Sequence, residues 1–536
     1  MTVSLALTFD DLIEELNDFG PYQIQAVLLL CFTAAFVSSW QFYDLIFVLY
    51  DPKKSCQQWN VDLTVIQDTL GNVTDECEYE GRQINTGLEQ ITLHCENWTF
   101  DQRYFESTVK TQWGLCHNQV LSKHLLSILT FFGVIGFAIF SIVQDVLGRK
   151  LVYFIILTLG LVGGLSSLLA PSLTAWLFIR AIGHCHGISS YSLPFIWAIE
   201  FVGPKKRTLV NFLMIIAYPI GTVSLGLVAW ACRTWIQIGL ATTLPFIALY
   251  SYIWLLDESP RWLLSVGKVN QATTILEKIA KRNKKEACVP LIKERAEAIA
   301  RSTLRESLEQ PKARPLDLIT YPHLRSKVIL LTIVWIANSL TYNSLAFNSS
   351  QLGNMYVAYI IQASVEAPAC IFTLFLSNRT GRIPPIILSM LWSALFSFMC
   401  IPSSLSNWSE WYFIVFSAMA KFGICISLNI LIQAVGELYP TSLRATGIGV
   451  NGIAGSVCVG IMPYILDTSE NALWLPMLIM GSLCFVGAVC CCVIPEPMAY
   501  TMPQTAAEEE HISEVGIKHV SHHVRNFITC RVEPLK

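Results

Sequence analysis

Charged residues are scarce in this sequence. Only 14% of its 536 residues are Asp, Glu, Lys or Arg, whereas a soluble domain carries about a quarter. The net charge of −3 argues against a nucleic-acid partner. The sequence has no Gly-x-x-x-x-Gly-Lys phosphate loop and no nucleophile–base or metal-ligand constellation. We therefore predict a protein that is not an enzyme, uses no ATP and needs no cofactor or metal.

Hydrophobic residues make up 53% of the chain and gather in twelve runs. Each run is near the roughly 20 residues that cross a bilayer as a helix. Without water in the hydrocarbon, such segments must be helical, so we predict an all-α membrane protein with twelve spans. The predicted spans are 22–43, 121–143, 151–171, 174–197, 209–230, 235–256, 328–347, 355–376, 384–402, 411–434, 447–466 and 472–494.

Basic residues lie in alternate short loops, which predicts the orientation in the membrane. The opposite set of short loops carries Arg233 alone. We therefore place the basic loops and both termini in the cytosol, and the acidic N-terminus without a basic start predicts no cleaved signal peptide. The basic loop residues are Arg149, Lys150, Lys205, Lys206, Arg207, Arg379, Arg382 and Arg444.

The spacing of the spans predicts five parts. The N-terminal segment has Phe9, Leu12, Ile13 and Leu16 on one helical face, so it should lie against the membrane or the bundle. The linker between the halves reads as a solvated helical bundle. The predicted parts are a cytosolic segment 1–21, a six-helix half 22–256 that includes an outer loop 44–120, a cytosolic linker 257–327, a second half 328–494 and a cytosolic tail 495–536.

The predicted outer loop has features of a secreted domain. Its four cysteines can form two disulfides with three possible connectivities, which the sequence does not separate. Two glycosylation acceptors fall in the same loop, at Asn72 and Asn97. The cysteines are Cys56, Cys77, Cys95 and Cys116.

Two short patterns occur twice, in the same order and at almost the same separation. Their repetition indicates two related six-helix halves. The repeated residues are Asp145, Gly148, Arg149, Glu200 and Arg207 in the first half, and Asn378, Gly381, Arg382, Glu437 and Arg444 in the second.

Together with Phe9-Asp10-Asp11-Leu12, Glu258-Ser-Pro260-Arg261 and Glu437-Leu-Tyr-Pro440, these patterns resemble the organic ion transporter family of the major facilitator superfamily. The resemblance implies twelve helices in two halves around a central cavity that opens to one side at a time. It also implies a plasma-membrane carrier whose partners are a small organic ion and the lipid bilayer. The sequence leaves the oligomeric state open.

The resemblance and the charges together predict a cytosolic gate. We expect Asp145 and Arg149 to bond across the interface of the halves and to helix ends. Two further pairs are expected, Glu200 with Arg207 and Glu437 with Arg444. The predicted gate residues are Asp145, Arg149, Glu200, Arg207, Glu258, Arg261, Arg382, Glu437 and Arg444.

The gate motif departs from the family pattern at three positions. Ser141 replaces a Gly, Val146 replaces an Arg, and Asn378 replaces an Asp. The departures predict a weaker gate, or one biased toward another conformation. They leave open a receptor-like protein of the same fold that does not transport. A sugar-type facilitator is a second alternative, which the Phe-Asp-Asp start and the long outer loop disfavour.

Charged side chains at membrane depth are costly and usually functional. Such residues are Arg180, Glu366 and Lys421, and the last two either pair with each other or contact the ligand. Trp335 and Tyr342 lie seven residues apart and share a helical face. Aromatic faces attract organic cations. The predicted cavity residues are Tyr191, Trp335, Asn338, Tyr342, Gln362, Glu366, Lys421, Asn429 and Ser456.

The charge that separates substrate classes in the resembled family is missing here. Ser456 stands where cation transporters usually carry Asp and where anion and carnitine transporters usually carry Arg. Cys370 likewise replaces a Lys of anion transporters. Glu366 and the aromatic residues favour a cation or a zwitterion over an anion.

Overall fold

The computed structural model describes residues 9–59, 83–85, 90–92, 95–114, 119–309, 317–349, 354–406, 409–440, 443–468 and 472–497. Within these residues, ten helices are long and apolar enough to cross a membrane. A shorter apolar helix, α25 (Leu475–Cys491), and a broken pair, α8 (Leu173–His184) and α9 (Ser189–Glu200), occupy the two remaining predicted spans. All twelve predicted segments are therefore helical.

The first half of the bundle is built from the N-terminal spans. Its first span comprises α2 (Pro21–Thr33), a π-helical turn (Ala34–Ser38) and α3 (Ser39–Val48). This span runs past its predicted end at residue 43, so the start of the predicted loop at 44 is wrong. The other spans of this half are α6 (Gln119–Leu147), α7 (Arg149–Leu168), α8, α9, α10 (Pro204–Ala231) and α11 to α13 (Trp235–Thr243, Pro245–Leu249, Tyr252–Leu255).

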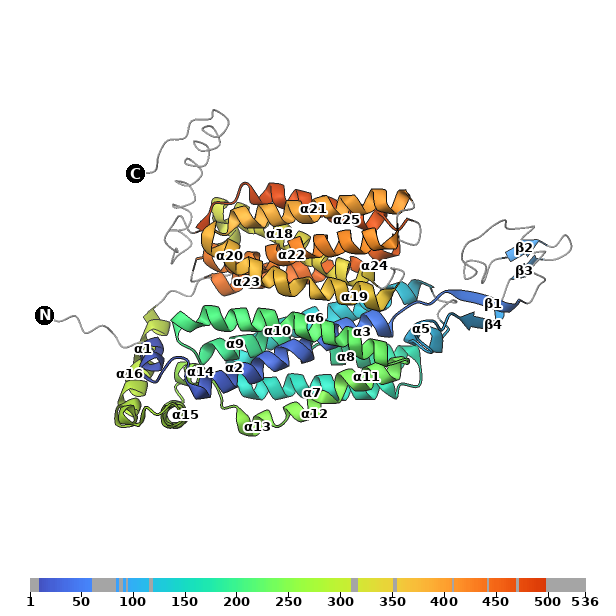
Figure 1. Ribbon diagram of the computed structural model, residues 1–536. Coiled ribbons are helices and arrows are strands. Elements are labelled where there is room, and N and C mark those ends of the chain that lie inside the picture. Colours follow the sequence, from blue (N-terminus) through green and yellow to red (C-terminus); the bar gives the residue numbers. More distant parts are fainter. Residues whose placement is uncertain are drawn as a thin grey trace, which may run out of the picture.

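The second half repeats this arrangement. Figure 1 shows its helices, coloured yellow to red, lying alongside those of the first half. Its spans are α18 (Pro322–Asn348), α19 (Met355–Ser364) with α20 (Glu366–Arg379), α21 (Ile383–Leu405), α22 (Glu410–Leu438), α23 (Arg444–Val459) with α24 (Met462–Asp467), and α25.

The halves meet along two seams. Helix α10 contacts α19 and α20 on one side of the bundle, and α6 contacts α23 and α24 on the other. Because each seam joins one helix of the first half to one span of the second, the molecule has the two-fold layout that the sequence repeat predicts.

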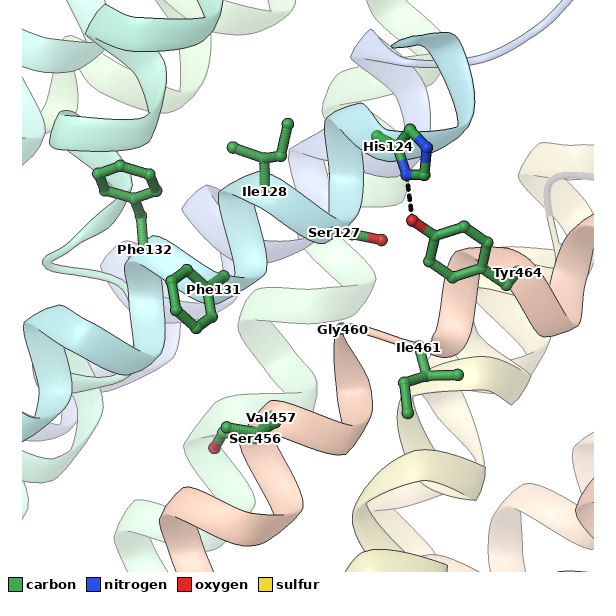
Figure 2. Close-up of a pocket in the computed structure, with 10 residues that line it drawn as sticks. All are labelled: His124, Ser127, Ile128, Phe131, Phe132, Ser456, Val457, Gly460, Ile461 and Tyr464. Carbon is green, nitrogen blue, oxygen red and sulfur yellow. Dashed lines mark hydrogen bonds between the residues drawn. The ribbon is translucent and has the colours of Figure 1, made fainter. Parts of the chain in front are cut away.

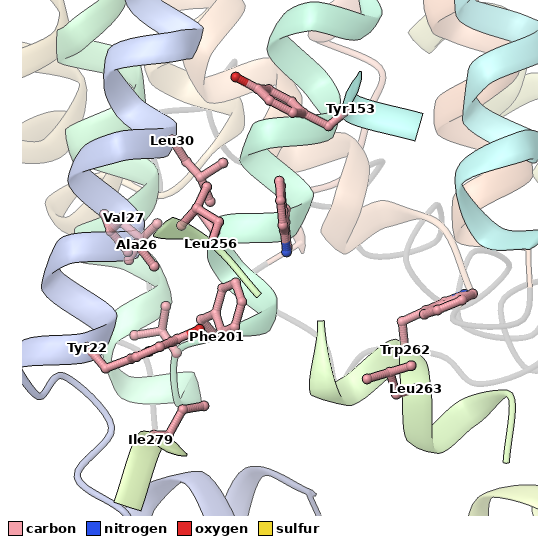
Figure 3. Packing of buried hydrophobic residues seen from close by; sticks show 14 of the residues in the cluster. Tyr22, Ala26, Val27, Leu30, Tyr153, Phe201, Leu256, Trp262, Leu263 and Ile279 are labelled. Carbon is pink, nitrogen blue, oxygen red and sulfur yellow. The ribbon is translucent and has the colours of Figure 1, made fainter. Parts of the chain in front are cut away.

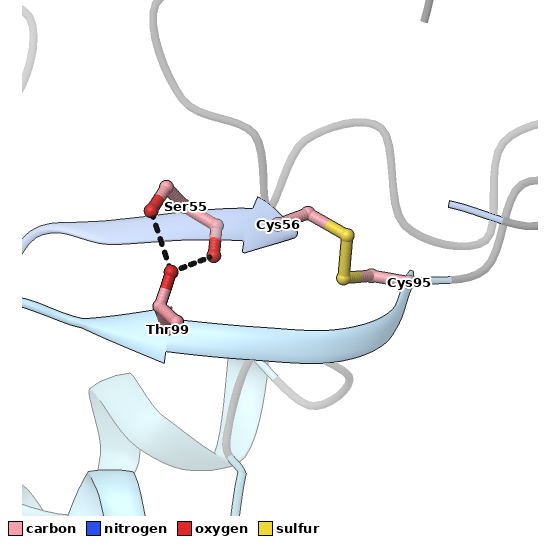
Figure 4. The surroundings of a disulfide bond; sticks show 4 residues. All are labelled: Ser55, Cys56, Cys95 and Thr99. Atoms are coloured by element: carbon pink, nitrogen blue, oxygen red, sulfur yellow. Dashed lines mark hydrogen bonds between the residues drawn. A yellow bond between two sulfur atoms is a disulfide. The ribbon is translucent and has the colours of Figure 1, made fainter. Parts of the chain in front are cut away.

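Four short strands mark one end of the bundle, which we call the strand end (Figure 1). There β1 (Lys54–Trp59) pairs with β4 (Cys95–Phe100), and β2 (Gln83–Asn85) pairs with β3 (Gln90–Thr92). A disulfide joins Cys56 to Cys95 across the first pair (Figure 4). The predicted cysteines Cys77 and Cys116 and the acceptor Asn72 lie outside the described residues, and Asn97 lies in β4.

Short helices cover the opposite end, which we call the linker end. They are α1 (Phe9–Glu15), α14 (Pro260–Ser265), α15 (Val269–Arg282), α16 (Val289–Glu309) and α17 (Asp317–Thr320). The apolar face of α1 is buried in one core with α14 to α16 and the adjoining span ends. Figure 3 shows Ile279 of that core near Tyr22 and Phe201, and Trp262 with Leu263 on the other side of the same view. The N-terminal segment therefore lies against the protein, as one of its two predicted placements required.

Candidate functional site

A charged cluster lies inside the second half, where α18, α20 and α22 meet. The Lys421 Nζ lies 3.3 Å from a Glu366 carboxylate oxygen, and the two side chains are 1% and 3% exposed. The Tyr342 hydroxyl donates to the other Glu366 oxygen at 3.0 Å. Since a buried charge is stable only when paired and hydrogen-bonded, the three side chains form one unit.

Lys421 also rests on an aromatic ring. Its Nζ lies 3.4 Å from the centre of the Tyr342 ring and donates to the Tyr342 carbonyl oxygen at 2.7 Å. A cation at this position is attracted by the ring quadrupole. The sequence left open whether Glu366 and Lys421 pair, and in this structure they do. The cluster therefore offers a carboxylate, an ammonium and an aromatic face within one small volume.

A row of tyrosines runs from the first half toward this cluster. The Tyr191 ring of α9 lies 5.6 Å from the Tyr218 ring of α10, and Tyr218 lies 6.4 Å from Tyr43 of α3. Tyr43 in turn lies 6.4 Å from Tyr359 of α19, in the second half. The predicted cavity residue Tyr191 therefore belongs to an aromatic wall shared by both halves. Its other three members were missed, because single tyrosines in apolar runs carry no distinguishing sequence signal.

Two more predicted cavity residues, Asn338 and Gln362, each precede a member of the charged cluster by four residues. Asn338 donates to the Val334 carbonyl oxygen at 2.9 Å, and Gln362 donates to the Ser417 hydroxyl at 3.3 Å. Both are buried between helices of the second half. Their amide N–H groups are thus used inside the bundle, whereas their side-chain oxygens are buried without a hydrogen-bond partner among the described residues.

Three other candidates have different surroundings. The Asn429 amide lies 3.7 Å from the Cys370 sulfur. The Trp335 ring packs on Gly455, where an added Cβ would meet it at 2.5 Å. Ser456 lines a groove at the seam between α6 and α23. The structure therefore does not place Ser456 beside Glu366 and Lys421.

A second buried ion pair lies in the first half, and sequence reasoning recognised only one of its members. Asp44 of α3 accepts from Arg180 of α8 at 2.5 Å, and the two side chains are 0% and 5% exposed. Thr242 adds a hydroxyl donor at 3.4 Å. Asp44 was missed because the predicted first span ended at residue 43, directly before it, whereas the helix continues to Val48.

We expect Asp44→Asn to destabilise the protein strongly. The substitution leaves the Arg180 charge buried without a counter-ion, which costs about 3–5 kcal/mol. The double variant Asp44→Leu with Arg180→Met should recover most of this loss, because apolar groups of similar size need no partner. Thermal melting of the purified variants in detergent checks both results. A double variant as unstable as Asp44→Asn would contradict the pairing.

A clamp of charged groups holds the start of α7 at the linker end. The Arg149 guanidinium donates to both oxygens of Glu200, with contacts of 2.8 to 3.2 Å, and also contacts Asp145 at 3.1 Å. Glu258 accepts from the backbone N–H groups of Arg149 and Lys150 at 3.0 and 3.1 Å. Burial raises the pKa of the Glu258 carboxyl, while these N–H donors act in the opposite direction.

The second half contains the same clamp at the start of α21. Arg382 donates to both oxygens of Glu437, with contacts of 2.8 to 3.2 Å. Glu496 accepts from the backbone N–H groups of Arg382 and Ile383 at 2.7 and 2.9 Å. Glu496 thus plays the part of Glu258. It was missed because it lies beyond the last span, although a proline follows it closely, as Pro260 follows Glu258.

In this structure the gate glutamates have other partners than those expected. Glu200 pairs with Arg149, and Glu437 pairs with Arg382. Each pair lies within one half rather than across the interface. Arg207 instead contacts Asp10 of α1 at 2.6 Å, and Arg261 contacts the same carboxylate at 3.3 Å. Seven residues separate Glu200 from Arg207 in sequence, but the turn at Gly203 starts a new helix and carries the arginine away.

A family model described as "Sugar (and other) transporter" matches residues 30–507. The chain belongs to this family. The match spans all the described helices from α3 to α25, so both clamps and the charged cluster lie inside it. The family and the fold are those of transporters of the major facilitator superfamily, not of enzymes.

Several curated transporters are similar to this chain over at least 80% of their own length. An organic cation transporter protein of Drosophila melanogaster is 27% identical, over 94% of this chain and 95% of the relative. A carcinine transporter of the same fly is 27% identical, over 96% and 80%. Solute carrier family 22 member 13 of Homo sapiens is 27% identical, over 94% and 93%.

Solved structures show the same fold. The proton:xylose symporter XylE bound to 6-bromo-6-deoxy-D-glucose superposes with a TM-score of 0.61 at 14% identity, covering 92% of this chain and 98% of that one. The partially occluded inward open form of XylE from E. coli gives 0.60 at 13% identity, covering 89% and 97%. The predicted major facilitator architecture of this transporter is therefore confirmed.

Proposed function

We propose that this protein carries small organic ions across the plasma membrane by alternating access, cations or zwitterions in preference to anions. The charged cluster of Glu366, Lys421 and Tyr342 carries the proposal. Its carboxylate and ammonium pair with each other and its ring faces Lys421, so a substrate amine or carboxylate would bind by exchanging with one of these partners. Relatives named as transporters of organic cations, carcinine and β-alanine support this substrate class.

The contacts between the halves support alternating access with the strand end closed. Phe47 of the first half stacks on Tyr356 of the second, with ring centres 6.4 Å apart, and the Tyr356 hydroxyl donates to the Tyr104 carbonyl oxygen. The clamps at the linker end, in contrast, are satisfied within each half. We propose that the clamp residues form the gate that engages when the linker end closes.

The proposal also includes an orientation in the membrane and a division of the chain into parts. We propose that the linker end, both termini, the linker 257–327 and the tail 495–536 lie in the cytosol, and that the strands lie outside the cell. The basic loops support this orientation, and the Cys56–Cys95 disulfide supports an oxidising outer environment for the strands. Ser456 is proposed to act from its seam rather than in direct contact with Glu366.

Uptake by Tyr342 variants tests the proposal. We expect Tyr342→Ala to reduce uptake of labelled organic cations and zwitterions at least tenfold, because it removes the ring that holds the Lys421 ammonium, and a desolvated cation–π contact is worth about 2 kcal/mol. Tyr342→Phe keeps the ring and loses only the hydrogen bond to Glu366, so its loss should be smaller. Uptake is measured per molecule at the cell surface, by surface biotinylation.

Tyr412→Ala is the matched control, because this exposed tyrosine lies on the outer side of the same half. It should leave uptake unchanged. Equal uptake by wild type and Tyr342→Ala for every substrate would count against the proposed site. Absence of wild-type uptake across cations, anions and zwitterions, with normal surface delivery, would count against transport itself.

A further inference from the structure

A groove of about 740 Å³ opens at the seam between α6 and α23–α24 (Figure 2). Ile128 and Phe131 of α6 form one wall, and Val457 and Ile461 form the other. The two walls come from different halves of the transporter. The groove therefore exists only while these helices lie side by side at the strand end.

The groove faces the surroundings of the bundle rather than the central cluster. Phe131 is 53% exposed, Val457 46% and Ile461 51%, and all three lie on membrane-spanning helices. Apolar side chains exposed on such helices contact lipid. Molecules dissolved in the bilayer can thus enter the groove from the side.

Polar groups lie at one end of the groove. The His124 ring nitrogen and the Tyr464 hydroxyl hydrogen-bond to each other from opposite halves (Figure 2). Beside them, the Ser127 hydroxyl oxygen is buried and has no hydrogen-bond partner among the described residues. A buried hydroxyl without a partner is costly, so a ligand with its own polar group would satisfy this one once the Ser127 side chain turns toward the groove.

The lining determines which ligand fits. Among the lining residues that the structure describes there is no Asp, Glu, Lys or Arg, so a charged headgroup would find no counter-ion among them. A ligand would match the groove if it placed one hydrogen-bonding group at the Ser127 end and an apolar body between Phe131 and Ile461. We propose that this groove binds a membrane sterol, a neutral lipid with a single hydroxyl and a rigid apolar body.

Such binding would also regulate the transporter. A ligand shifts a conformational equilibrium only when it binds one state better than the other. Because the groove is built from both halves, a bound sterol stabilises the conformation in which the strand end is closed. Excess sterol should then lower the maximal uptake rate without competing with substrate; this consequence rests on the proposed transport function, whereas binding does not.

Photolabelling tests the binding directly. The full-length protein is placed in vesicles with a photoreactive sterol that carries an alkyne, and the labelled peptides are mapped. We expect labels on 119–147 and 444–467. Val457→Trp fills the groove and should reduce this labelling at least fivefold. Val489→Trp makes the same change at a 53% exposed position of α25 and should not reduce it.

Competition on the wild-type protein removes any dependence on the folding of variants. Unlabelled cholesterol should compete at least fivefold better than its methyl ether, which cannot donate a hydrogen bond to Ser127. Ser127→Ala should remove this difference. Equal competition by the ether, equal labelling with a photoreactive phospholipid, or labelling unaffected by Val457→Trp would overturn the proposal. If the wild-type protein is labelled as expected but takes up no organic ion, the proposed transport function fails while the sterol site stands.

Discussion

Glu366→Gln is expected to leave little folded, active transporter. The substitution keeps the size of the side chain but removes the negative charge of the carboxylate. In the structure a carboxylate oxygen of Glu366 lies 3.3 Å from the Lys421 Nζ. An ammonium left buried without its counter-ion costs about 3–5 kcal/mol, a large fraction of the stability of most proteins. We expect a lower melting temperature in detergent, less protein at the cell surface and uptake near background.

The charge-exchanged double variant separates stability from substrate recognition. Glu366→Lys with Lys421→Glu restores an ion pair at the same two positions, so the melting temperature should recover most of the loss. The carboxylate then lies over the Tyr342 ring, where it is repelled by the negative face. Uptake of cations should therefore stay low although the protein is folded.

The outcomes of this pair of variants are decisive. Normal uptake by Glu366→Gln would show that the carboxylate is dispensable and would contradict the proposed site. Recovery of both stability and cation uptake in the double variant would show that the pair is structural only. Measurements per surface molecule keep folding and recognition apart.

The overall architecture could be predicted because it depends on long apolar runs and on a repeat. Twelve runs indicated twelve helical segments, and the structure has helices in all of them. The boundaries failed where polar residues are buried inside a helix. Asp44 reads as the start of a polar loop, but its pairing with Arg180 keeps it within the first span.

The site could be predicted in part. Glu366 and Lys421, the two charged residues predicted at membrane depth in the second half, stood out because each interrupts an apolar run, and both belong to the observed cluster. Asn338 and Gln362 carried the same polar signal, yet Asn338 bonds to the Val334 carbonyl oxygen of its own helix and Gln362 to Ser417 of a neighbouring helix. A sequence shows which residues are polar in a span but not toward which neighbour each one turns.

The charge partners at the linker end could not be predicted, because sequence distance is a poor guide there. Arg149 and Glu200 are 51 residues apart and pair, whereas Glu200 and Arg207 are close in sequence and do not. Only the three-dimensional packing of α7 against α9 brings the first two together. The repeat nevertheless identified most residues of both clamps.

Gly148→Ala is expected to impair the clamp of the first half, and Gly381→Ala the clamp of the second half. The two glycines have φ angles of +99° and +88°, which disfavour residues with a Cβ. An added Cβ at Gly148 would lie 2.5 Å from a Glu258 oxygen, and one at Gly381 would lie 2.8 Å from the Glu496 carboxyl carbon. Each carboxylate would have to leave the helix N-terminus that it caps.

Gly267→Ala is the matched control for this effect. Gly267 also has a positive φ of +78°, but an added Cβ there meets nothing within 4 Å. All three variants incur the backbone strain of about 1–2 kcal/mol. Only the two clamp variants also lose charge-assisted hydrogen bonds, worth about 1.5–3 kcal/mol each.

The comparison of melting temperature and uptake therefore isolates the clamps. We expect Gly267→Ala to melt slightly below wild type and to keep most of its uptake. Gly148→Ala and Gly381→Ala should melt well below the control and lose most uptake per surface molecule. Because the clamps are equivalent in the two halves, the two losses should be similar in size. A loss no greater than that of Gly267→Ala would show that the carboxylate caps contribute little to the transporter.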